Sequence, residues 1–195
     1  MDRHPTLLDP ATSVLLVVDM QEPFLQVMHG RDALTANVIL LCKTAAILGI
    51  PVMMTTQNVA RMGPVIPAVV HSVPIAGRAI GGNSPLPVID KMSFSCASSE
   101  LFERTFGALG RKQVVLCGLE THICVSQTAH DLRYAGYQVH VVADAVSSRT
   151  LEKHKLGMER IRDAGILPCA AEAAVYEWVR VAGTAEFREI LPLVK

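Results

Sequence analysis

Short apolar runs of strand length alternate with longer amphipathic stretches of helix length along this chain. The runs are almost continuous in apolar residues and cover residues 14–18, 52–56, 114–117 and 139–142, the last broken only by a histidine. Strands that are buried on both faces of a sheet have this composition, and a strand-helix-strand order joins parallel strands by right-handed crossovers. The alternation therefore predicts an α/β domain of three layers, with a parallel sheet between two layers of helices.

The stretches between the runs have the periodicity of helices, and most of them end at a glycine. Apolar residues recur at helical spacing from Leu34 to Leu48, and Gly49 follows as a predicted C-cap. Further helices are predicted over residues 101–109, 121–135, 151–164 and 170–181. At 195 residues the chain has the length of one domain, so residues 1–195 are predicted to form a single unit.

Residues 58–87 depart from this alternation, because they contain five prolines and four glycines. Loops of this length often form the wall or lid of a site, or a contact between copies of a chain, and both interpretations remain open. The GGNS segment at residues 81–84 is predicted to be a turn, since it lacks the Lys-Ser/Thr ending of a phosphate-binding loop.

Charge and composition exclude several classes of partner. The 18 Lys and Arg residues balance the 18 Asp and Glu residues, and charged residues make up only 18% of the chain. Nucleic-acid grooves and acidic membrane surfaces require a basic excess, so neither is a predicted partner. Half of the residues are apolar, which rules out disorder and favours burial against further copies of the chain. We assign the apolar segments 65–73 and 191–194 to such contacts and predict a homo-oligomer, a dimer or larger.

The same composition bears on the cellular compartment. The most apolar N-terminal run ends at Asp19, far short of the roughly 20 residues that cross a bilayer. It also lacks the basic flank and the cleavage site of a signal peptide. Five cysteines without regular spacing do not indicate a disulfide framework. We therefore expect a cytoplasmic protein with reduced thiols.

Three reactive side chains follow runs of strand length. Asp19 comes directly after the first run, Lys91 follows a short run at residues 86–89, and Cys124 lies where a turn leads into a helix. Ligands bind at the carboxyl ends of the strands in open parallel sheets, so an acid, a base and a thiol could meet in one crevice. Taken alone, each also has a plainer role as a turn residue, a surface charge or a small core residue. Position alone leaves both interpretations open.

Local motifs around these residues favour catalysis. The segments LLVVDMQ (15–21), DKMSF (90–94) and GLETHICV (118–125) resemble, in this order, motifs of the isochorismatase-like cysteine hydrolase superfamily over essentially the whole chain. The C-terminal segments AGTAEF (182–187) and LPL (191–193) resemble the isochorismatase-domain-containing branch, whose substrates are largely unassigned. The resemblance implies the isochorismatase-like hydrolase fold, with a six-stranded parallel sheet in the order 3-2-1-4-5-6.

The same resemblance implies the parts of a catalytic site. These are a triad of Asp19, Lys91 and Cys124, a non-proline cis peptide between Leu119 and Glu120, and an oxyanion hole formed by the backbone N–H groups of Glu120 and Cys124. Lys91 and the helix N-terminus are expected to lower the pKa of the Cys124 thiol, because both favour the thiolate. Asp19 would take the thiol proton, and the sulfur would attack a carbonyl carbon to form a thioester.

The sequence departs from the nicotinamidases of this superfamily after the second run. Nicotinamidases carry an Asp-x-His metal site there, whereas this chain reads TTQNVAR at residues 55–61. We therefore predict no metal site and no cofactor, and a nicotinamidase is disfavoured. A zinc site is also disfavoured, because the spacing of its candidate ligands matches no familiar pattern; these are Cys117, His122, Cys124 and His130.

Three further residues are candidates for the substrate pocket. Gln57, at the end of the second strand, is predicted either to orient a substrate amide or to serve in a turn. Phe24 and Phe94 each follow a triad member by a few residues, and we interpret them either as apolar pocket walls or as core residues. His122 is expected to line the pocket or to face the flank of the helix, without a catalytic role.

The leading hypothesis is a metal-independent cysteine hydrolase that cleaves a C–N or acyl bond in a small, uncharged, amide-like substrate. Cys124 favours this hypothesis, since true isochorismatases, which hydrolyse a vinyl ether, often lack that residue. Two alternatives stay open. One is a vinyl-ether hydrolase of the isochorismate type with Asp19 as the acid, and the other is a catalytically weak oligomeric scaffold or regulatory protein.

Overall fold

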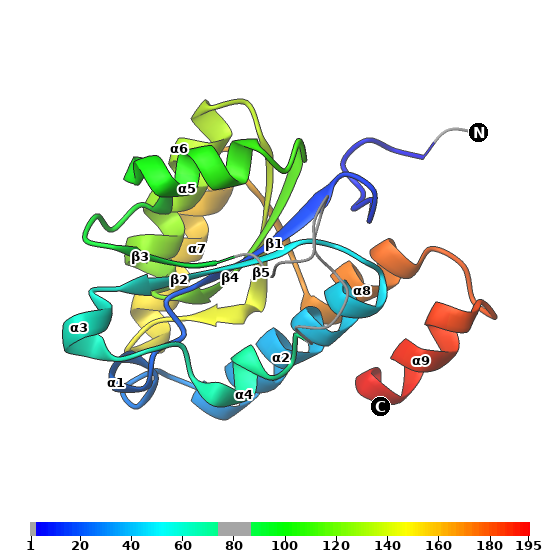
Figure 1. Ribbon diagram of the computed structural model, residues 1–195, viewed down its shortest axis with the longest axis horizontal. Coiled ribbons are helices and arrows are strands. Elements are labelled where there is room, and N and C mark those ends of the chain that lie inside the picture. The colour runs from blue at the N-terminus through cyan, green and yellow to red at the C-terminus, as the bar shows by residue number, and fades with distance from the viewer. Residues whose placement is uncertain (1–2, 74–86) are drawn as a thin grey trace.

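A six-stranded sheet forms the centre of the computed structural model, which describes residues 3–73 and 87–195 (Figure 1). The strands pair in parallel in the order β3-β2-β1-β4-β5-β6. This arrangement confirms the fold class and the strand order that the motifs implied. The strands are β1 Ser13–Val18, β2 Val52–Gln57, β3 Val88–Lys91, β4 Gln113–Leu119, β5 Gln138–Ser147 and β6 Leu167–Cys169.

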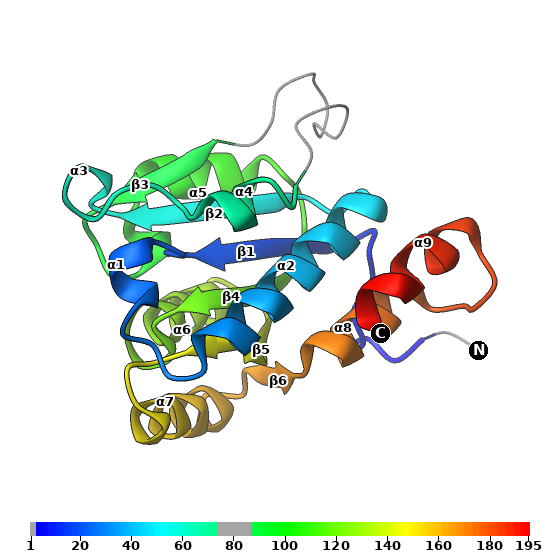
Figure 2. The same ribbon diagram turned by 90° about the horizontal axis from the view of Figure 1, so that it is seen from below.

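Helices cover both faces of this sheet, as Figures 1 and 2 show. The helices are α1 Glu22–Leu25, α2 Arg31–Ile47, α3 Val59–Met62, α4 Pro67–Val70, α5 Glu100–Gly107, α6 Ser126–Tyr134, α7 Leu151–Asp163, α8 Ala171–Val179 and α9 Ala185–Val194. One face carries α5, α6 and α7, and the other carries α2, α4 and α8. Helix α9 packs on α2 and α8, at the end of the molecule away from α1 and α3. Within the described ranges, no helix combines the length and the apolar character that a membrane crossing requires.

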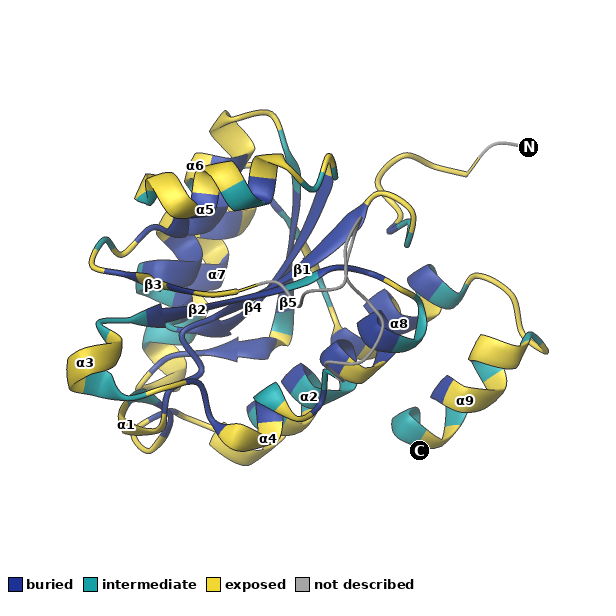
Figure 3. Ribbon diagram, viewed as in Figure 1, coloured by how far each residue is buried: buried dark blue, intermediate teal, exposed yellow. Residues whose placement is uncertain are grey.

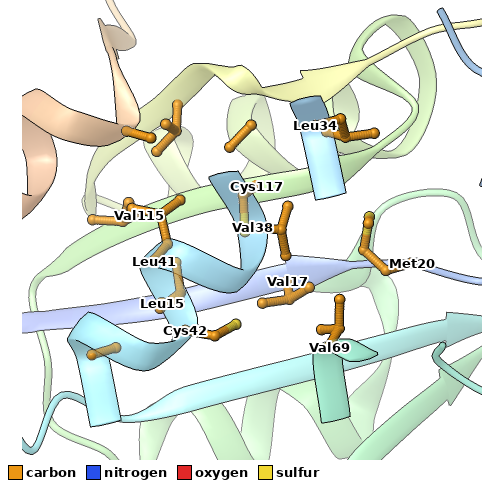
Figure 4. Close-up of a cluster of buried hydrophobic side chains, with 14 of the residues drawn as sticks. Leu15, Val17, Met20, Leu34, Val38, Leu41, Cys42, Val69, Val115 and Cys117 are labelled. Carbon is orange, nitrogen blue, oxygen red and sulfur yellow. The ribbon is translucent and has the colours of Figure 1, made fainter. Parts of the chain in front are cut away.

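Strand β1 is buried along its whole length and sends alternate side chains to the two faces of the sheet. Leu15 and Val17 lie in one core cluster with Val38 of α2, which crosses over the strands in Figure 4. Leu16 and Val18 belong to the second cluster, under α5, α6 and α7. Figure 3 shows the strands buried and the outer helix faces exposed. Burial on both sides is the reason why the sequence of β1 is almost continuously apolar.

The proline-rich segment after β2 is more regular than a loop, because α3 and α4 lie within residues 58–87. Val65 and Val69 are buried in the same core cluster as α2. The prediction that residues 65–73 serve contacts between copies is therefore wrong for these side chains, since the chain's own core already buries them. The predicted turn at residues 81–84 lies outside the described residues.

Three elements were not predicted by the sequence pattern, or differ from what it predicted. Strand β6 has only three residues and α9 contains Pro192, so neither meets the usual criteria for its type. The helix predicted from residue 121 begins with a wider, π-helical turn, η2 (Thr121–Val125), and α6 continues from it. Residues 191–194 form the end of α9, and their role in contacts between copies stays a prediction.

Candidate active site

The carboxyl ends of β1, β3 and β4 meet at one edge of the parallel sheet, at the end where α1 and α3 lie (Figure 2). Asp19 directly follows β1, Lys91 is the last residue of β3, and Cys124 lies in η2 after β4. A cavity of about 60 Å³ opens at this edge. Its walls are formed by Asp19, Phe24, Gln57, Phe94, Leu119, Glu120, Ile123 and Cys124.

Asp19 is held in an unusual backbone conformation by a threonine of the neighbouring strand. Its φ angle of 49° is in the left-handed region, which a non-glycine residue adopts at a cost of about 1–3 kcal/mol. The Thr55 hydroxyl donates to Asp19 Oδ1 at 2.7 Å and accepts from the Asp19 backbone N–H at 3.3 Å. Thr55 is fully buried, so this pair of bonds fixes both the backbone and the carboxylate of Asp19.

Lys91 forms a buried ion pair with Asp19. Its Nζ lies 2.7 Å from Asp19 Oδ2, and the exposed fractions of the two side chains are 0% and 2%. Burial is the largest single influence on Lys91 and lowers its pKa. The charge of Asp19, with smaller contributions from Cys96, Cys124 and the hydrogen bond to Asp19, together outweighs burial and raises the pKa above its ordinary value. The ammonium also donates to Gln57 Oε1 at 2.8 Å and to the Ser93 carbonyl at 3.3 Å. Lys91 is therefore a cation with its three hydrogen atoms directed to protein acceptors.

Gln57 lines the pocket, but its side-chain amide is used within the protein. Its Oε1 accepts from Lys91, and its Nε2 donates to the Met92 carbonyl at 2.8 Å. Its backbone N–H donates to the buried side chain of Gln21 at 2.7 Å. These contacts give Gln57 a role in positioning Lys91, and its predicted role in orienting a substrate amide stays a prediction.

Sequence reasoning missed two of these supporting residues. Thr55 stood out only as a polar residue within a buried strand, and such a residue needs a hydrogen-bond partner. Gln21 follows Asp19 by two positions within the LLVVDMQ segment, and it joins two segments by donating to the carbonyls of Gly63 at 2.7 Å and Gln57 at 3.3 Å.

The Cys124 thiol is neutral in this site. Burial, then the charge of Asp19 and a hydrogen bond to its carboxylate, raise the pKa of Cys124 to about 12. The charge of Lys91 acts in the opposite direction and does not compensate. The expectation of a lowered pKa is therefore wrong, because Lys91 is already paired with a carboxylate and the thiol lies in a largely desolvated position, 7% exposed.

The turn that carries Cys124 depends on a close approach of two strands. A Cβ atom on Gly118, whose φ is 108°, would lie 2.1 Å from the Val18 carbonyl oxygen, so no larger residue fits. The following peptide bond, Leu119–Glu120, is cis. The Glu120 carbonyl then accepts hydrogen bonds from the backbone N–H groups of Ile123 and Val125, which sets the start of η2.

Helix α7 packs against the outer side of this turn. A Cβ atom on Gly157 would lie 3.0 Å from the backbone N and Cα of His122, so the two segments are in close contact. His122 Nδ1 forms a 2.9 Å hydrogen bond with Ser148 Oγ, and His122 does not form part of the pocket wall. The turn is thus held from outside, and His122 contributes to its support.

The remaining pocket walls are apolar. Phe24 comes from α1, and Phe94 comes from the segment after β3, so both predicted pocket phenylalanines reach the cavity. Phe94 is 54% exposed, which excludes the alternative that it is a core residue. Leu119 and Ile123 complete these walls from the β4–η2 side.

Among residues 3–73 and 87–195, no cluster of three or more His, Cys, Asp or Glu side chains has an arrangement that could hold a metal ion. The candidates for a zinc site have other surroundings: Cys117 is buried in the core cluster under α2, and His130 Nδ1 bonds the Ser126 carbonyl at 2.7 Å. The cavity wall instead holds the thiol of Cys124 and the carboxylate of Asp19, and the ammonium of Lys91 is buried against that carboxylate. These three groups together suit nucleophilic and acid–base chemistry.

Comparisons with known proteins cover nearly the whole chain. The model of the isochorismatase domain family matches residues 13–173. The secreted isochorismatase effector Isc1 of Phytophthora sojae is 36% identical over 187 residues, which are 95% of this chain and 86% of that protein. Among solved structures, the MAR1 ribonuclease of Caenorhabditis elegans has a TM-score of 0.86 and 29% identity, covering 96% of this chain and 92% of its own. The YcaC gene product of Escherichia coli, described as an octameric hydrolase of unknown specificity, has a TM-score of 0.83 and 22% identity, covering 100% and 89%.

Proposed function

Since the chain belongs to the isochorismatase family of hydrolases, we propose that it is a metal-independent cysteine hydrolase that cleaves a small amide-like or acyl substrate through a thioester on Cys124. One observation carries this proposal. A buried Asp19–Lys91 ion pair of 2.7 Å lies at a cavity with apolar walls, and the Asp19 carboxylate and the Cys124 thiol line this cavity together.

The first step begins from the neutral thiol. Asp19 takes the proton of Cys124 as the sulfur attacks the carbonyl carbon, and the electron pair of the C=O double bond moves to the oxygen. The backbone N–H groups of Glu120 and Cys124 would stabilise this oxyanion, at roughly 3–4 kcal/mol for each donor.

The second half of the reaction returns the proton. Asp19 protonates the leaving amine as the C–N bond breaks, which leaves a thioester on Cys124. Asp19 then takes a proton from water, and the resulting hydroxide oxygen attacks the thioester carbon. The carboxylic acid leaves, and the sulfur recovers its proton from Asp19.

Lys91 has a role both before and after Asp19 accepts the thiol proton. While Asp19 is ionised, the ammonium at 2.7 Å stabilises the carboxylate in a buried position. Once Asp19 has accepted the thiol proton, the charge of Lys91 is no longer neutralised and it stabilises the new thiolate and oxyanion. This exchange explains how a thiol with a raised pKa could still act as a nucleophile.

The test is a screen of amides and carbamoyl compounds, with intact-mass detection of an adduct on Cys124. Cys124→Ala is expected to abolish both turnover and the adduct, whereas Cys169→Ala, at the far edge strand β6, is expected to retain them. Full activity of Cys124→Ala on a verified substrate would overturn covalent catalysis. Retained hydrolysis of a vinyl ether by that variant, with loss in Asp19→Asn, would instead indicate isochorismate-type chemistry. No turnover and no adduct across the panel would favour a scaffold.

We also propose that the chain forms a homo-oligomer in the cytoplasm and binds neither nucleic acid nor membrane surfaces. The octameric state described for the YcaC neighbour and the apolar composition support the first part. The balanced charge supports the absence of binding to nucleic acid and membranes. Because one structural neighbour is named a ribonuclease, single-stranded RNA is included in the substrate screen, and cleavage or binding of it would contradict this part of the proposal.

A further inference from the structure

The polar side chains that line the pocket have partners inside the protein. The two carboxylate oxygens of Asp19 accept hydrogen bonds from Thr55 and Lys91, each at 2.7 Å. The amide of Gln57 accepts from Lys91 and donates to the Met92 carbonyl, each at 2.8 Å. Both side chains are therefore already hydrogen-bonded within the protein.

Glu120 brings a second carboxylate to the pocket wall, and this charge is also paired. Its Oε2 lies 3.1 Å from Nε of Arg149, and its side chain is 12% exposed. An anionic substituent on a ligand would face the carboxylates of Glu120 and Asp19. A cationic substituent would have to compete with Arg149 and Lys91, so charge of either sign is unfavourable in this pocket.

The apolar walls include a phenyl ring that stays half in water. Phe94 is 54% exposed, although hydrogen bonds hold its segment. Lys91 donates to the Ser93 carbonyl at 3.3 Å, and the Ser93 hydroxyl donates to the Ser95 carbonyl at 2.8 Å. A ring held in this way at the rim of a cavity can bury its face against an apolar group of a ligand, and such burial favours binding.

We propose that the pocket receives a short, uncharged, apolar acyl group between Phe24 and Phe94, so that the substrates are primary carboxamides R–CO–NH2 with a small aliphatic R. This inference rests on the proposed function and names its substrate class. The cavity of about 60 Å³ is far below the roughly 300–1,000 Å³ of pockets for drug-sized ligands, which limits R to a few carbons. In the reaction the C–N bond breaks, water supplies the oxygen of the new acid, and the products are R–COO⁻ and NH4⁺.

The first experiment measures kcat/KM for acetamide, propionamide and butyramide. We expect a rise of roughly fourfold with each added methylene, the effect of removing one CH2 from water. Succinamate, which ends in a carboxylate, is expected to react about 100-fold more slowly than butyramide or not at all. A flat series, or a preference for succinamate, would overturn the inference.

A pair of variants assigns the effect to the pocket wall. Phe94→Ala is expected to reduce the gain in kcat/KM for each methylene to less than about twofold, because one of the two phenyl rings that would bury R is lost. Tyr134→Ala is the matched control: it removes an aromatic side chain that is 97% exposed at the end of α6, and it should keep the full gradient. An equal gain in kcat/KM for each methylene in the two variants would contradict a contact between Phe94 and R.

A second experiment separates this inference from the proposed function. A thiol adds to an aldehyde carbon while its proton moves to the oxygen, and this addition needs neither a leaving group nor water. Binding of ¹³C-labelled acetaldehyde, propionaldehyde, butyraldehyde and succinic semialdehyde is measured by NMR in the native chain and in Cys124→Ala. An affinity that rises from acetaldehyde to butyraldehyde and falls for succinic semialdehyde, without turnover of any amide, would support the acyl selectivity and overturn the proposed function. Amide turnover with a kcat/KM that does not depend on R would support the proposed function and overturn the acyl selectivity.

Discussion

Replacing Asp19 by Asn is expected to make the Cys124 thiol more reactive toward iodoacetamide and, at the same time, to abolish hydrolysis. Besides burial, the charge of Asp19 and its hydrogen bond hold the pKa of Cys124 up at about 12. Asparagine keeps the shape of the side chain but removes its negative charge. The ammonium of Lys91 then stabilises the thiolate without an opposing carboxylate. The pKa of Cys124 therefore falls. Hydrolysis stops because no base remains to take the thiol proton.

The magnitude follows from the fraction of thiolate. At pH 8 a thiol with a pKa of about 12 is ionised to roughly one part in 10⁴, whereas one at the ordinary value of 9.0 is about one tenth ionised. Native Cys124 should thus react about a thousandfold more slowly than an ordinary exposed thiol. Each unit by which Asp19→Asn lowers the pKa should accelerate labelling about tenfold in this pH range.

The assay is a time course of iodoacetamide labelling at pH 7, 8 and 9, with Cys124 followed by peptide mass spectrometry and glutathione as the reference thiol. Asp32→Asn is the control, because Asp32 lies in the first turn of α2 with its side chain 95% exposed. Native Cys124 that labels faster than glutathione at pH 7 would refute a neutral thiol. Slower labelling in Asp19→Asn than in the native chain would refute the role of the carboxylate.

A companion variant protects this test against a folding defect. Asp19→Asn leaves Lys91 buried without its carboxylate, and breaking a buried ion pair in this way costs about 3–5 kcal/mol. Asp19→Asn combined with Lys91→Met removes both charges. Burial then acts alone on Cys124, so the pKa stays raised and labelling stays slow. The contrast between the single and the double variant isolates the charge of Lys91.

Two further predictions concern positioning and stability. Thr55→Val removes the hydroxyl that bonds the Asp19 carboxylate and backbone, a bond to a charged group worth about 1.5–3 kcal/mol, so kcat should fall about 10–100-fold at nearly constant KM. Thr55→Ser should recover most of this activity, and an equal loss in both variants would indicate packing instead. Burial lowers the pKa of His140 from 6.5 to about 4, so its neutral form contributes stability above pH 6.5 that is lost as the pH falls through 4. Urea unfolding at pH 7, 5.5 and 4 should show a loss of roughly 3 kcal/mol that His140→Asn abolishes, and an unchanged pH dependence in the variant would contradict this origin.

The central strands were predictable from the sequence, because burial on both faces makes a strand almost continuously apolar. The convergence of three side chains was predictable as well. Asp19 and the Cys124 turn follow β1 and β4, Lys91 is the last residue of β3, and parallel strands end at a common edge. Strand β6 was not predictable, since three residues carry no periodicity, and Pro192 hid the helical character of α9.

The pKa of Cys124 was harder to predict than the identity of the residues that form the site. The lowered pKa expected for Cys124 came from counting a nearby cation and a helix start, which the sequence makes visible. The depth of burial and the hydrogen bond to Asp19 depend on three-dimensional packing, and they reverse the sign. Thr55 and Gln21 were missed for a similar reason, because their partners lie on other strands or loops.

The Cys124 side and the Phe94 side of the pocket differ in how far a substitution would disturb the packing of the protein. Cys124 sits on a turn that Gly157 of α7 and the Gly118–Val18 contact hold within the core, so substitutions there strain packed backbone. Phe94 projects from a half-exposed surface segment, where most exchanges leave the core intact. Substrate preference can therefore drift through the exposed wall while the nucleophile stays in place. A laboratory search for altered specificity should begin at that wall, where mutational tolerance and contact with the ligand coincide.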